Sequence, residues 1–133
     1  MESQNTKIVQ DAYAAFLRGD VTSLLGLMSD DIVWEPVLGT ASHVPFSGKR
    51  QGKPAVAEFF QLVATNEDFS QFEAREFIAQ GDAVVAVGHY RATTKSTGKT
   101  FDSDFAMVFT LKDGKVVRFR EFTDSAGVNA AFA

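Results

Sequence analysis

The second half of the chain is predicted to form strands joined by tight turns, and this feature constrains the fold most. Apolar or alternating segments cover residues 72–79, 83–93, 100–111 and 115–123. Gly81-Asp82 and Asp113-Gly114 have the composition of hairpin turns between such segments. Strands that follow one another through short turns pair in opposite directions, so this half predicts an antiparallel sheet.

The first half is predicted to be mainly helical, with one strand. Apolar residues recur at helical spacing from Ile8 to Leu17, and Asp20 can cap a second, shorter helix. Residues 32–37 form a strand, and another amphipathic helix begins near Pro54. Helices that precede strands predict an α+β domain, in which about three N-terminal helices pack on one face of a curved antiparallel sheet.

Length and composition limit the possible functions. The 133 residues fit one domain, 1–133, and thirteen phenylalanines supply more aromatic wall than a small core needs. A net charge of −4 and a pI near 5.1 argue against nucleic-acid binding, which needs a face rich in Lys and Arg. The lack of cysteine excludes disulfides and thiolate metal sites, and we expect neither a metal nor a cofactor.

No apolar run is long enough to span a bilayer, and the first residues lack the apolar region of a signal peptide. We therefore expect no membrane partner and a cytoplasmic location.

Residues 38–52 are predicted to form a long loop, because they hold three glycines and little periodicity. Val44, Pro45 and Phe46 are an apolar segment within it. We expect this loop to be a lid over a pocket, with His43 able to titrate near neutral pH.

The last hairpin can be assigned a register from its turn. Lys112-Asp113-Gly114 suits a three-residue loop, which would pair Phe109 with Val117 and Phe105 with Glu121. One face of the hairpin would then be apolar and aromatic: Phe101, Phe105, Met107, Phe109, Val117 and Phe119. Glu121 would be a lone carboxylate on that face. It is either in a structural ion pair with a cation such as Arg91, or a pocket acid or base.

Several short segments resemble one family over nearly the whole chain. They are Arg18-Gly19-Asp20, Trp34-Glu35-Pro36-Val37, Ser47-Gly48, Gly52, Gly81-Asp82, Asp113-Gly114-Lys115-Val116 and Glu121-Phe122-Thr123-Asp124. In these segments and in the order of its elements, the chain resembles SnoaL-like proteins and relatives of ketosteroid isomerase, in the nuclear-transport-factor-2-like (NTF2-like) superfamily. The resemblance implies a cone-like sheet with a pocket between sheet and helices.

The resemblance also implies roles for particular residues. The acidic residue before the proline that ends the first strand is the general base of the isomerases, and Glu35 occupies that position. Matching Gly81 to the corresponding turn directs Val87, His89 and Arg91 toward the pocket. Catalytic candidates are thus Glu35, Glu121, His89 and Arg91, although Glu35 at a strand end beside water and His89 as an ordinary hydrogen-bonded histidine remain open alternatives.

The walls of the expected pocket follow from the same alternation and resemblance. The expected lining residues are Tyr13, Phe16, Val33, Phe59, Val87, Phe105, Met107, Phe119 and Thr123. The isomerase oxyanion donors are missing, because Ala12 and Met107 stand at the tyrosine and aspartate positions. Steroid isomerisation is therefore not expected.

We expect a SnoaL-like enzyme that transfers a proton on a small hydrophobic carbonyl compound, as an isomerase, aldol cyclase or lyase does. A ligand-binding protein without turnover, or a hydrolase that resembles limonene epoxide hydrolase, remains possible on the same scaffold. A homodimer is expected as well, because the outer sheet face with Ala106, Val108, Val116 and Phe122 is rather apolar and relatives pair through it.

Overall fold

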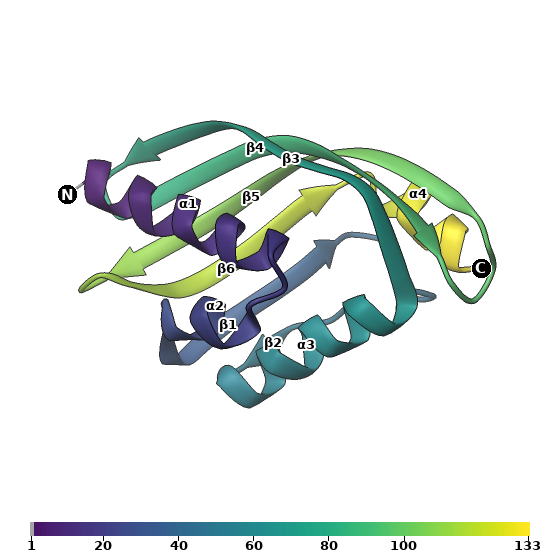
Figure 1. Cartoon of the computed structure of the whole chain (residues 1–133), viewed down its shortest axis with the longest axis horizontal. Coiled ribbons are helices and arrows are strands. Elements are labelled where there is room, and N and C mark those ends of the chain that lie inside the picture. The colour runs from purple at the N-terminus through teal and green to yellow at the C-terminus, as the bar shows by residue number, and fades with distance from the viewer. Residues whose placement is uncertain (1) are drawn as a thin grey trace.

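The computed structural model describes residues 2–133 as four helices and six strands, which appear in Figure 1. In chain order they are α1 (Glu2–Leu17), α2 (Val21–Gly26), β1 (Met28–Leu38), β2 (Arg50–Gln51), α3 (Lys53–Asn66), β3 (Glu67–Gln80), β4 (Ala83–Thr94), β5 (Thr100–Lys112), β6 (Lys115–Thr123) and α4 (Ser125–Phe132). The predicted α+β class is confirmed.

The strands form one curved sheet in the order β2-β1-β6-β5-β4-β3. Every neighbouring pair is antiparallel except β1 and β6, which run parallel and join the N-terminal half to the last strand. Helices α1, α2 and α3 lie on one side of the sheet, and α4 lies at one end of it (Figure 1). The sheet and these helices enclose the core.

Two aspartates cap helices by accepting hydrogen bonds from backbone N–H groups. Asp20 accepts from the N–H of Ser23 at 3.0 Å and starts α2, as predicted. Asp124 accepts from the N–H of Gly127 at 3.1 Å and starts α4. The sequence interpretation missed α4, although the cap and the apolar residues after it indicate a short helix.

The turn between β5 and β6 differs from the predicted one. Asp113 and Gly114 both have positive φ, 52° and 76°, so the loop has two residues rather than three. The register then shifts at Thr110 and Leu111, so that Met107 lies opposite Glu121 and Phe105 opposite Thr123. The predicted partners were therefore wrong by two positions, but an even error leaves the side chains beyond the irregularity on their predicted faces.

Val117 and Val116 are the exceptions, because they adjoin this irregularity. Val116 is buried, whereas it was expected on the outer face, and Val117 does not join the inner face as expected.

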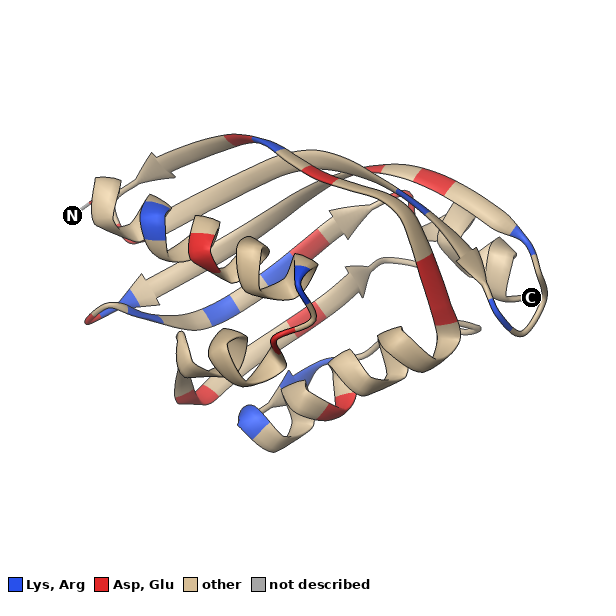
Figure 2. Cartoon of the chain, viewed as in Figure 1, with Lys and Arg blue, Asp and Glu red and all other residues tan. Residues whose placement is uncertain are grey.

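Charged residues are interspersed by sign along the elements in Figure 2 rather than gathered as one basic face. Within residues 2–133, no helix is both long and apolar enough to cross a membrane. The predicted cytoplasmic location stays a prediction.

Candidate active site

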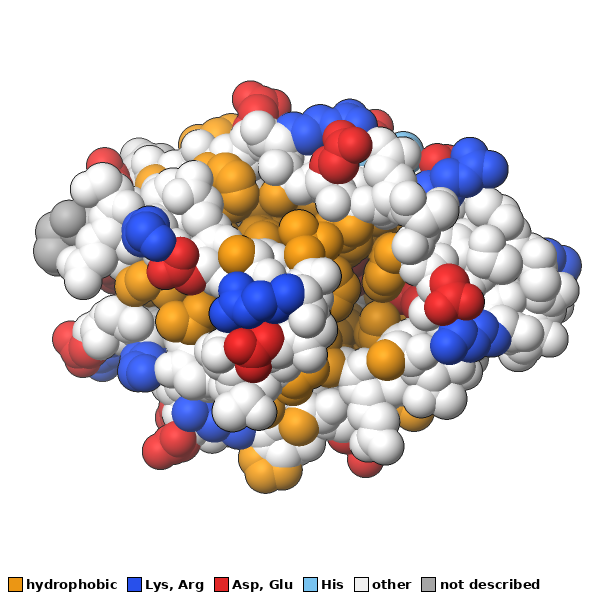
Figure 3. All heavy atoms as spheres, in the orientation of Figure 1, with side chains coloured by type: hydrophobic (Ala, Val, Ile, Leu, Met, Phe, Trp, Pro, Cys, Tyr) orange, Lys and Arg blue, Asp and Glu red, His pale blue; other side chains and the backbone are white. Residues whose placement is uncertain are grey.

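A cavity of about 80 Å³ lies between the inner face of the sheet and helices α1 to α3. Figure 3 shows a hollow with orange, hydrophobic walls near the middle of the molecule, and red acidic atoms are visible inside it. Twelve of the twenty lining residues are aromatic: Tyr13, Phe16, Trp34, Phe46, Phe59, Phe60, Phe69, Phe72, Tyr90, Phe101, Phe109 and Phe119. The excess of phenylalanine in the sequence is therefore mostly cavity wall.

Glu121 is the carboxylate that the sheet directs into this cavity. It is 6% exposed, and its Oε1 accepts a 2.9 Å hydrogen bond from the N–H of Val37. Its Oε2 accepts a longer bond, 3.3 Å, from the hydroxyl of Tyr90. Burial raises the pKa of Glu121 to about 7, although both hydrogen bonds oppose the rise. The group can therefore both accept and donate a proton near neutral pH.

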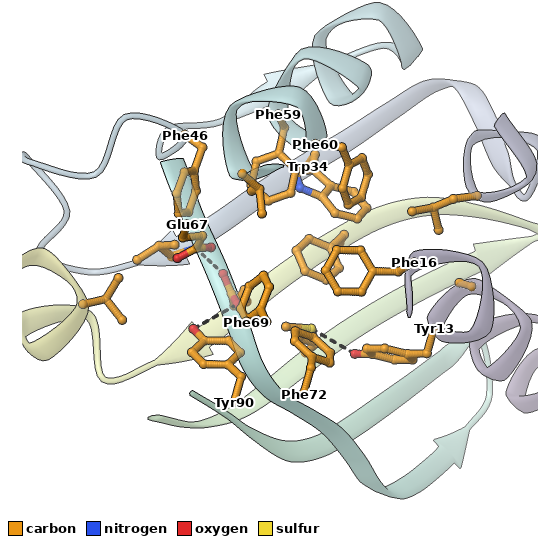
Figure 4. Close-up of a pocket in the computed structure, with 18 of the residues that line it drawn as sticks. Tyr13, Phe16, Trp34, Phe46, Phe59, Phe60, Glu67, Phe69, Phe72 and Tyr90 are labelled. Atoms are coloured by element: carbon orange, nitrogen blue, oxygen red, sulfur yellow. Dashed lines mark hydrogen bonds between the residues drawn. The ribbon is translucent and has the colours of Figure 1, made fainter. Parts of the chain in front are cut away.

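Glu67 is a second buried carboxyl in the same cavity. It is the first residue of β3, directly after α3, and it is 6% exposed. Burial, together with the nearby Glu121, raises the pKa of Glu67 to about 8. Figure 4 shows Glu67 and Tyr90 at one end of the pocket, with Tyr13 and Phe16 at the other. The cavity thus has an acidic end and an apolar end.

Tyr90 connects the acidic end to a short chain of hydroxyl groups. Its hydroxyl lies 2.8 Å from the Oγ1 of Thr123, which lies 2.6 Å from the Oγ of Ser103. Ser103 in turn donates to the carbonyl of Asp104 and accepts from the N–H of Asp124. This chain fixes the Tyr90 ring beside Glu121.

The apolar end has one polar contact, in which the Tyr13 hydroxyl donates to the Sδ of Met107 at 2.9 Å. Tyr13 also packs against Phe72, Phe105 and Phe109. Burial raises the pKa of Tyr13 well above its usual value, so this hydroxyl stays protonated.

Glu35 does not face the cavity, so the predicted orientation of this residue was wrong. Its side chain lies on the outer face of the sheet, where Oε1 pairs with Arg118 at 3.3 Å. The preceding residue, Trp34, lines the cavity instead and stacks on Phe119 with ring centroids 3.8 Å apart. Val33 alternates with Trp34 and therefore lies outside the pocket as well.

The alternation of β4 is also opposite to the expected one. Val84, Ala86, Tyr90 and Ala92 are buried on the inner face. Val87, His89 and Arg91 occupy the intervening outer positions. The error has a physical cause: residues 83–87 are apolar throughout, so their sequence carries no two-residue period to identify a face.

On the outer face, His89 and Arg91 form an ion-pair cluster with β5. His89 lies 2.9 Å from Asp104 and 3.0 Å from Asp102, and Arg91 lies 3.2 Å from Asp102. The side-chain hydrogen bonds to Asp104 and Asp102 raise the pKa of His89. Arg91 therefore does not pair with Glu121, and no Lys, Arg or His is among the described residues that line the cavity.

Most of the other expected wall residues do line the cavity. Tyr13, Phe16, Phe59, Met107 and Phe119 face it as predicted. Phe105 and Thr123 lie directly behind the wall, where Phe105 packs on the rings of Tyr13 and Tyr90. Gly88 leaves room for Phe105, because a Cβ there would lie 2.6 Å from its ring and 1.9 Å from the carbonyl oxygen of Glu73.

The loop after β1 contributes Phe46 to the wall, and both Val44 and Phe46 are buried. Two hydrogen bonds join this loop to α4: the N–H of Thr40 donates to Ser125 at 3.1 Å, and the N–H of His43 donates to Asn129 at 2.7 Å. The loop therefore covers part of the pocket, and its movement as a lid stays a prediction.

Glu67 and Tyr90 are the site residues that sequence reasoning missed. Because His89 and Arg91 were expected to face the pocket, the residue between them, Tyr90, fell on the outer face. The strand that holds Glu67 was expected to begin only near Phe72. A glutamate directly after the amphipathic helix, at the start of a strand that faces the same core, was the available signal for Glu67. In the described chain, no group of three or more His, Asp or Glu side chains could hold a metal ion.

Comparisons with known proteins agree with this architecture. An NTF2-like protein from Burkholderia xenovorans LB400 is 33% identical, with a TM-score of 0.90 over 100% of this chain and 98% of that one. An NTF2-like protein from Burkholderia thailandensis E264 is 28% identical, with a TM-score of 0.85 over 97% of each chain. TerC, co-crystallised with polyporic acid, is 27% identical, with a TM-score of 0.80 over 97% of this chain and 98% of that one.

None of the curated proteins compared with the chain matches it. The model of the SnoaL-like domain, however, matches residues 9–119. With the structural similarity above, this match shows that the chain belongs to the SnoaL-like family and has the NTF2-like fold.

Proposed function

We propose that this protein is an enzyme that transfers a proton on a small, uncharged, largely apolar carbonyl compound, with Glu121 as the proton acceptor. One observation carries the proposal. Glu121 is a buried carboxylate without a cationic partner, and the Val37 N–H and the Tyr90 hydroxyl fix it in a cavity with aromatic walls. A purely structural ionised glutamate in an apolar core is normally held by a cation, and without one the carboxyl can change its protonation state near neutral pH.

The environment of Glu121 suits the chemistry. A carboxylate near its usual pKa is a weak base toward carbon acids, and desolvation strengthens it. Burial raises the pKa of Glu121 to about 7, which keeps a large fraction ionised at neutral pH. Isomerisation, aldol cyclisation and related eliminations all begin with the removal of a proton beside a carbonyl group. We therefore retain these three reaction types.

The walls favour a flat substrate. Aromatic side chains stack on planar rings, and polyporic acid is the compound with which TerC was co-crystallised. A cavity of about 80 Å³ is smaller than the ~150 Å³ engineered cavity that binds benzene. A substrate with one or two rings therefore requires Phe46 or a neighbouring wall residue to move, which agrees with the predicted lid.

Deuterium uptake tests the proposal. Uncharged ketones with an aromatic ring, such as 2-tetralone, are incubated with the protein in D₂O, and uptake at the α-carbon is followed by proton NMR. Wild-type protein should accelerate the exchange of at least one ketone above the buffer rate, and Glu121→Gln should remove the acceleration. Acceleration that is unchanged in Glu121→Gln would contradict the assignment of Glu121.

A ligand-binding protein without turnover is the second candidate. It is favoured by one observation: the hydroxyls of Tyr13 and Tyr90 are both engaged within the protein, so neither is free to stabilise an enolate. Trp34 is the single tryptophan and lines the cavity, so quenching of its fluorescence reports binding. Binding without deuterium exchange would favour this candidate. A hydrolase with a carboxylate held by arginine is not favoured, because the described lining residues include no arginine.

We further propose a homodimer formed through the outer face of the sheet. An apolar patch lies there across four strands, made of Ile78, Val85, Val87, Ala106, Val108 and Phe122. Ile78 and Phe122 are 55% and 44% exposed, which is high for large apolar side chains. Charged residues, among them Arg118 and Asp104, surround this patch, as suits a surface that pairs with its own copy.

A further inference from the structure

Glu67 is buried at the acidic end of the cavity without compensation for a charge. The residue is 6% exposed, and its Oε2 is fully enclosed and has no hydrogen-bond partner. No Lys, Arg or His of the described chain lines this cavity, and the other carboxyl there, Glu121, repels a second negative charge. A carboxyl in such surroundings keeps its proton.

None of the other polar groups that line the cavity is free to donate a proton to a substrate. The Tyr13 hydroxyl donates to Met107, and the Tyr90 hydroxyl is shared between Glu121 and Thr123. The N–H of Trp34 is buried and unpartnered, but its ring is packed flat on Phe119 and it cannot release a proton. Glu67 is therefore the group that can supply a proton to an oxygen in this cavity.

We propose that Glu67 is a second catalytic residue of this site, whose protonated carboxyl donates a hydrogen bond and then its proton to the carbonyl oxygen of the substrate. The inference rests on the proposed function of Glu121. It assigns the two carboxyls complementary roles: Glu121 receives a proton from carbon, and Glu67 gives one to oxygen.

The proton transfers balance in both directions. Glu121 removes a proton from the α-carbon, the C–H electron pair becomes the C=C bond, and the C=O π pair takes the proton of Glu67. The product of this step is a neutral enol beside a protonated Glu121 and an ionised Glu67. In the return step the enol hydroxyl gives its proton back to Glu67, and Glu121 protonates carbon. Both residues regain their starting states, and no other reactant is needed.

The same arrangement defines the substrate class. A neutral enol forms without a cation, so the lack of Lys, Arg and His in the described lining no longer prevents catalysis. A substrate that carries a carboxylate or phosphate would place a further negative charge beside two carboxyls. The site therefore takes an uncharged ketone or aldehyde with a flat apolar body, whose carbonyl oxygen lies toward Glu67.

The test compares Glu67→Gln with Glu76→Gln, since Glu76 is an exposed glutamate on the same strand and gives a matched control. Exchange of 2-tetralone in D₂O should fall on the order of 10²- to 10⁴-fold in Glu67→Gln, as general-acid losses do, and stay unchanged in Glu76→Gln. In wild type, exchange should decline above about pH 8, where the pKa of Glu67 lies. Thermal melts check that Glu67→Gln is folded.

Infrared spectroscopy gives a reading that does not need turnover. At pH 6.5 Glu121 is itself largely protonated, so the spectra are recorded on proteins that carry Glu121→Gln. Glu121→Gln should still show the carbonyl stretch of a protonated carboxyl, and this band should vanish when Glu67→Gln is added but not when Glu76→Gln is added. A missing band overturns the inference, whatever the rates are. If wild type accelerates exchange, Glu121→Gln abolishes it and Glu67→Gln equals wild type, the role of Glu67 is wrong and the proposed function stands. If wild type accelerates no ketone, both are wrong.

Discussion

The backbone N–H of Val37 donates a 2.9 Å hydrogen bond to Glu121, across the parallel pair of β1 and β6. Two residues of β1, Pro36 and Val37, stand opposite the single residue Glu121, because the register shifts between the pairs formed by Glu35 and Leu38. Val37 has a φ of 48°, which is rare for a β-branched residue. This irregularity directs the N–H inward, and it represents backbone strain stored beside the candidate base.

The strain at Val37 can be measured by substitution. Glycine adopts positive φ freely, so Val37→Gly loses a buried side chain but relieves the backbone. Val84→Gly is the matched control, because Val84 is fully buried in a regular strand. We expect Val37→Gly to lose about 1–3 kcal/mol less unfolding free energy than Val84→Gly in urea denaturation. Equal losses would show that the Val37 backbone is not strained.

Substitution of Glu121 and of Glu35 should have very different effects on the exchange rate. Glu121→Gln keeps the shape of the side chain but cannot accept a proton at neutral pH, so exchange should fall on the order of 10²- to 10⁴-fold. Glu35→Gln changes only an ion pair with Arg118 on the outer face. We expect an unchanged exchange rate and a stability change within about 1 kcal/mol. Kinetics and melts of both variants decide the matter, and the reverse result would restore Glu35 as the base.

The pH dependence of stability should report the two buried carboxyls. In the unfolded chain they lose protons near pH 4.5, whereas the folded-state pKa is about 7 for Glu121 and about 8 for Glu67. Between these values the folded state binds more protons, so the unfolding free energy should fall as pH rises from 4.5 to 8. At about 1.4 kcal/mol per pH unit, the loss is on the order of 3 kcal/mol for Glu121 and on the order of 5 kcal/mol for Glu67.

Substitution separates these carboxyls from other titrating groups. The raised pKa of His89, caused by Asp104 and Asp102, also makes stability fall as pH rises. Glu67→Gln should therefore be about as stable as wild type at pH 4.5 and clearly more stable at pH 8. Its unfolding free energy should change with pH only as far as the remaining titrating groups require. A Glu67→Gln curve parallel to wild type in chemical denaturation would mean that Glu67 is not desolvated.

The apolar patch on the outer face should mediate dimerisation. Val85 lies opposite Ile78 on β3 and Val108 on β5, near the middle of the patch. Val85→Glu should convert the dimer into a monomer in sedimentation velocity, because it buries an unpaired charge at a two-fold interface. Thr65→Glu, on the exposed side of α3, should leave the dimer intact. A wild-type monomer at micromolar concentration would overturn the dimer itself.

The sequence correctly predicted which side of the sheet a side chain occupies in strands that alternate apolar and polar residues. It did not do so in strands without this alternation. The hairpin of β5 and β6 alternates apolar and polar side chains, so Glu121 was placed on the inner face despite the wrong turn. In β4 the apolar run before Gly88 has no alternation, and the resemblance then selected the wrong face for His89 and Arg91. Glu35 was placed in the pocket because of its position in a motif. A position in a motif does not determine which side of a strand a residue occupies.

The acidic end of the cavity depended on contacts that no local pattern encodes. Glu67, Val37 and Tyr90 meet Glu121 from three separate strands, and the irregular backbone at Val37 is visible only in three dimensions. The apolar wall of the cavity could be predicted from the sequence more readily. Helical spacing identified Tyr13 and Phe16, and strand alternation identified Met107 and Phe119. Composition and period thus predict the lining, while the placement of the polar groups needs the tertiary structure.

The most direct measurement is the titration of the Glu121 carboxyl itself. Protein labelled with ¹³C at the glutamate side-chain carboxyl is followed by NMR from pH 4 to 10, and comparison with Glu121→Gln identifies its resonance. We expect a midpoint of about 7, because the carboxyl is buried and has no cation to hold it ionised. A midpoint near 4.5 would show a solvated or ion-paired carboxylate, and would contradict the role of Glu121 as a base poised at neutral pH.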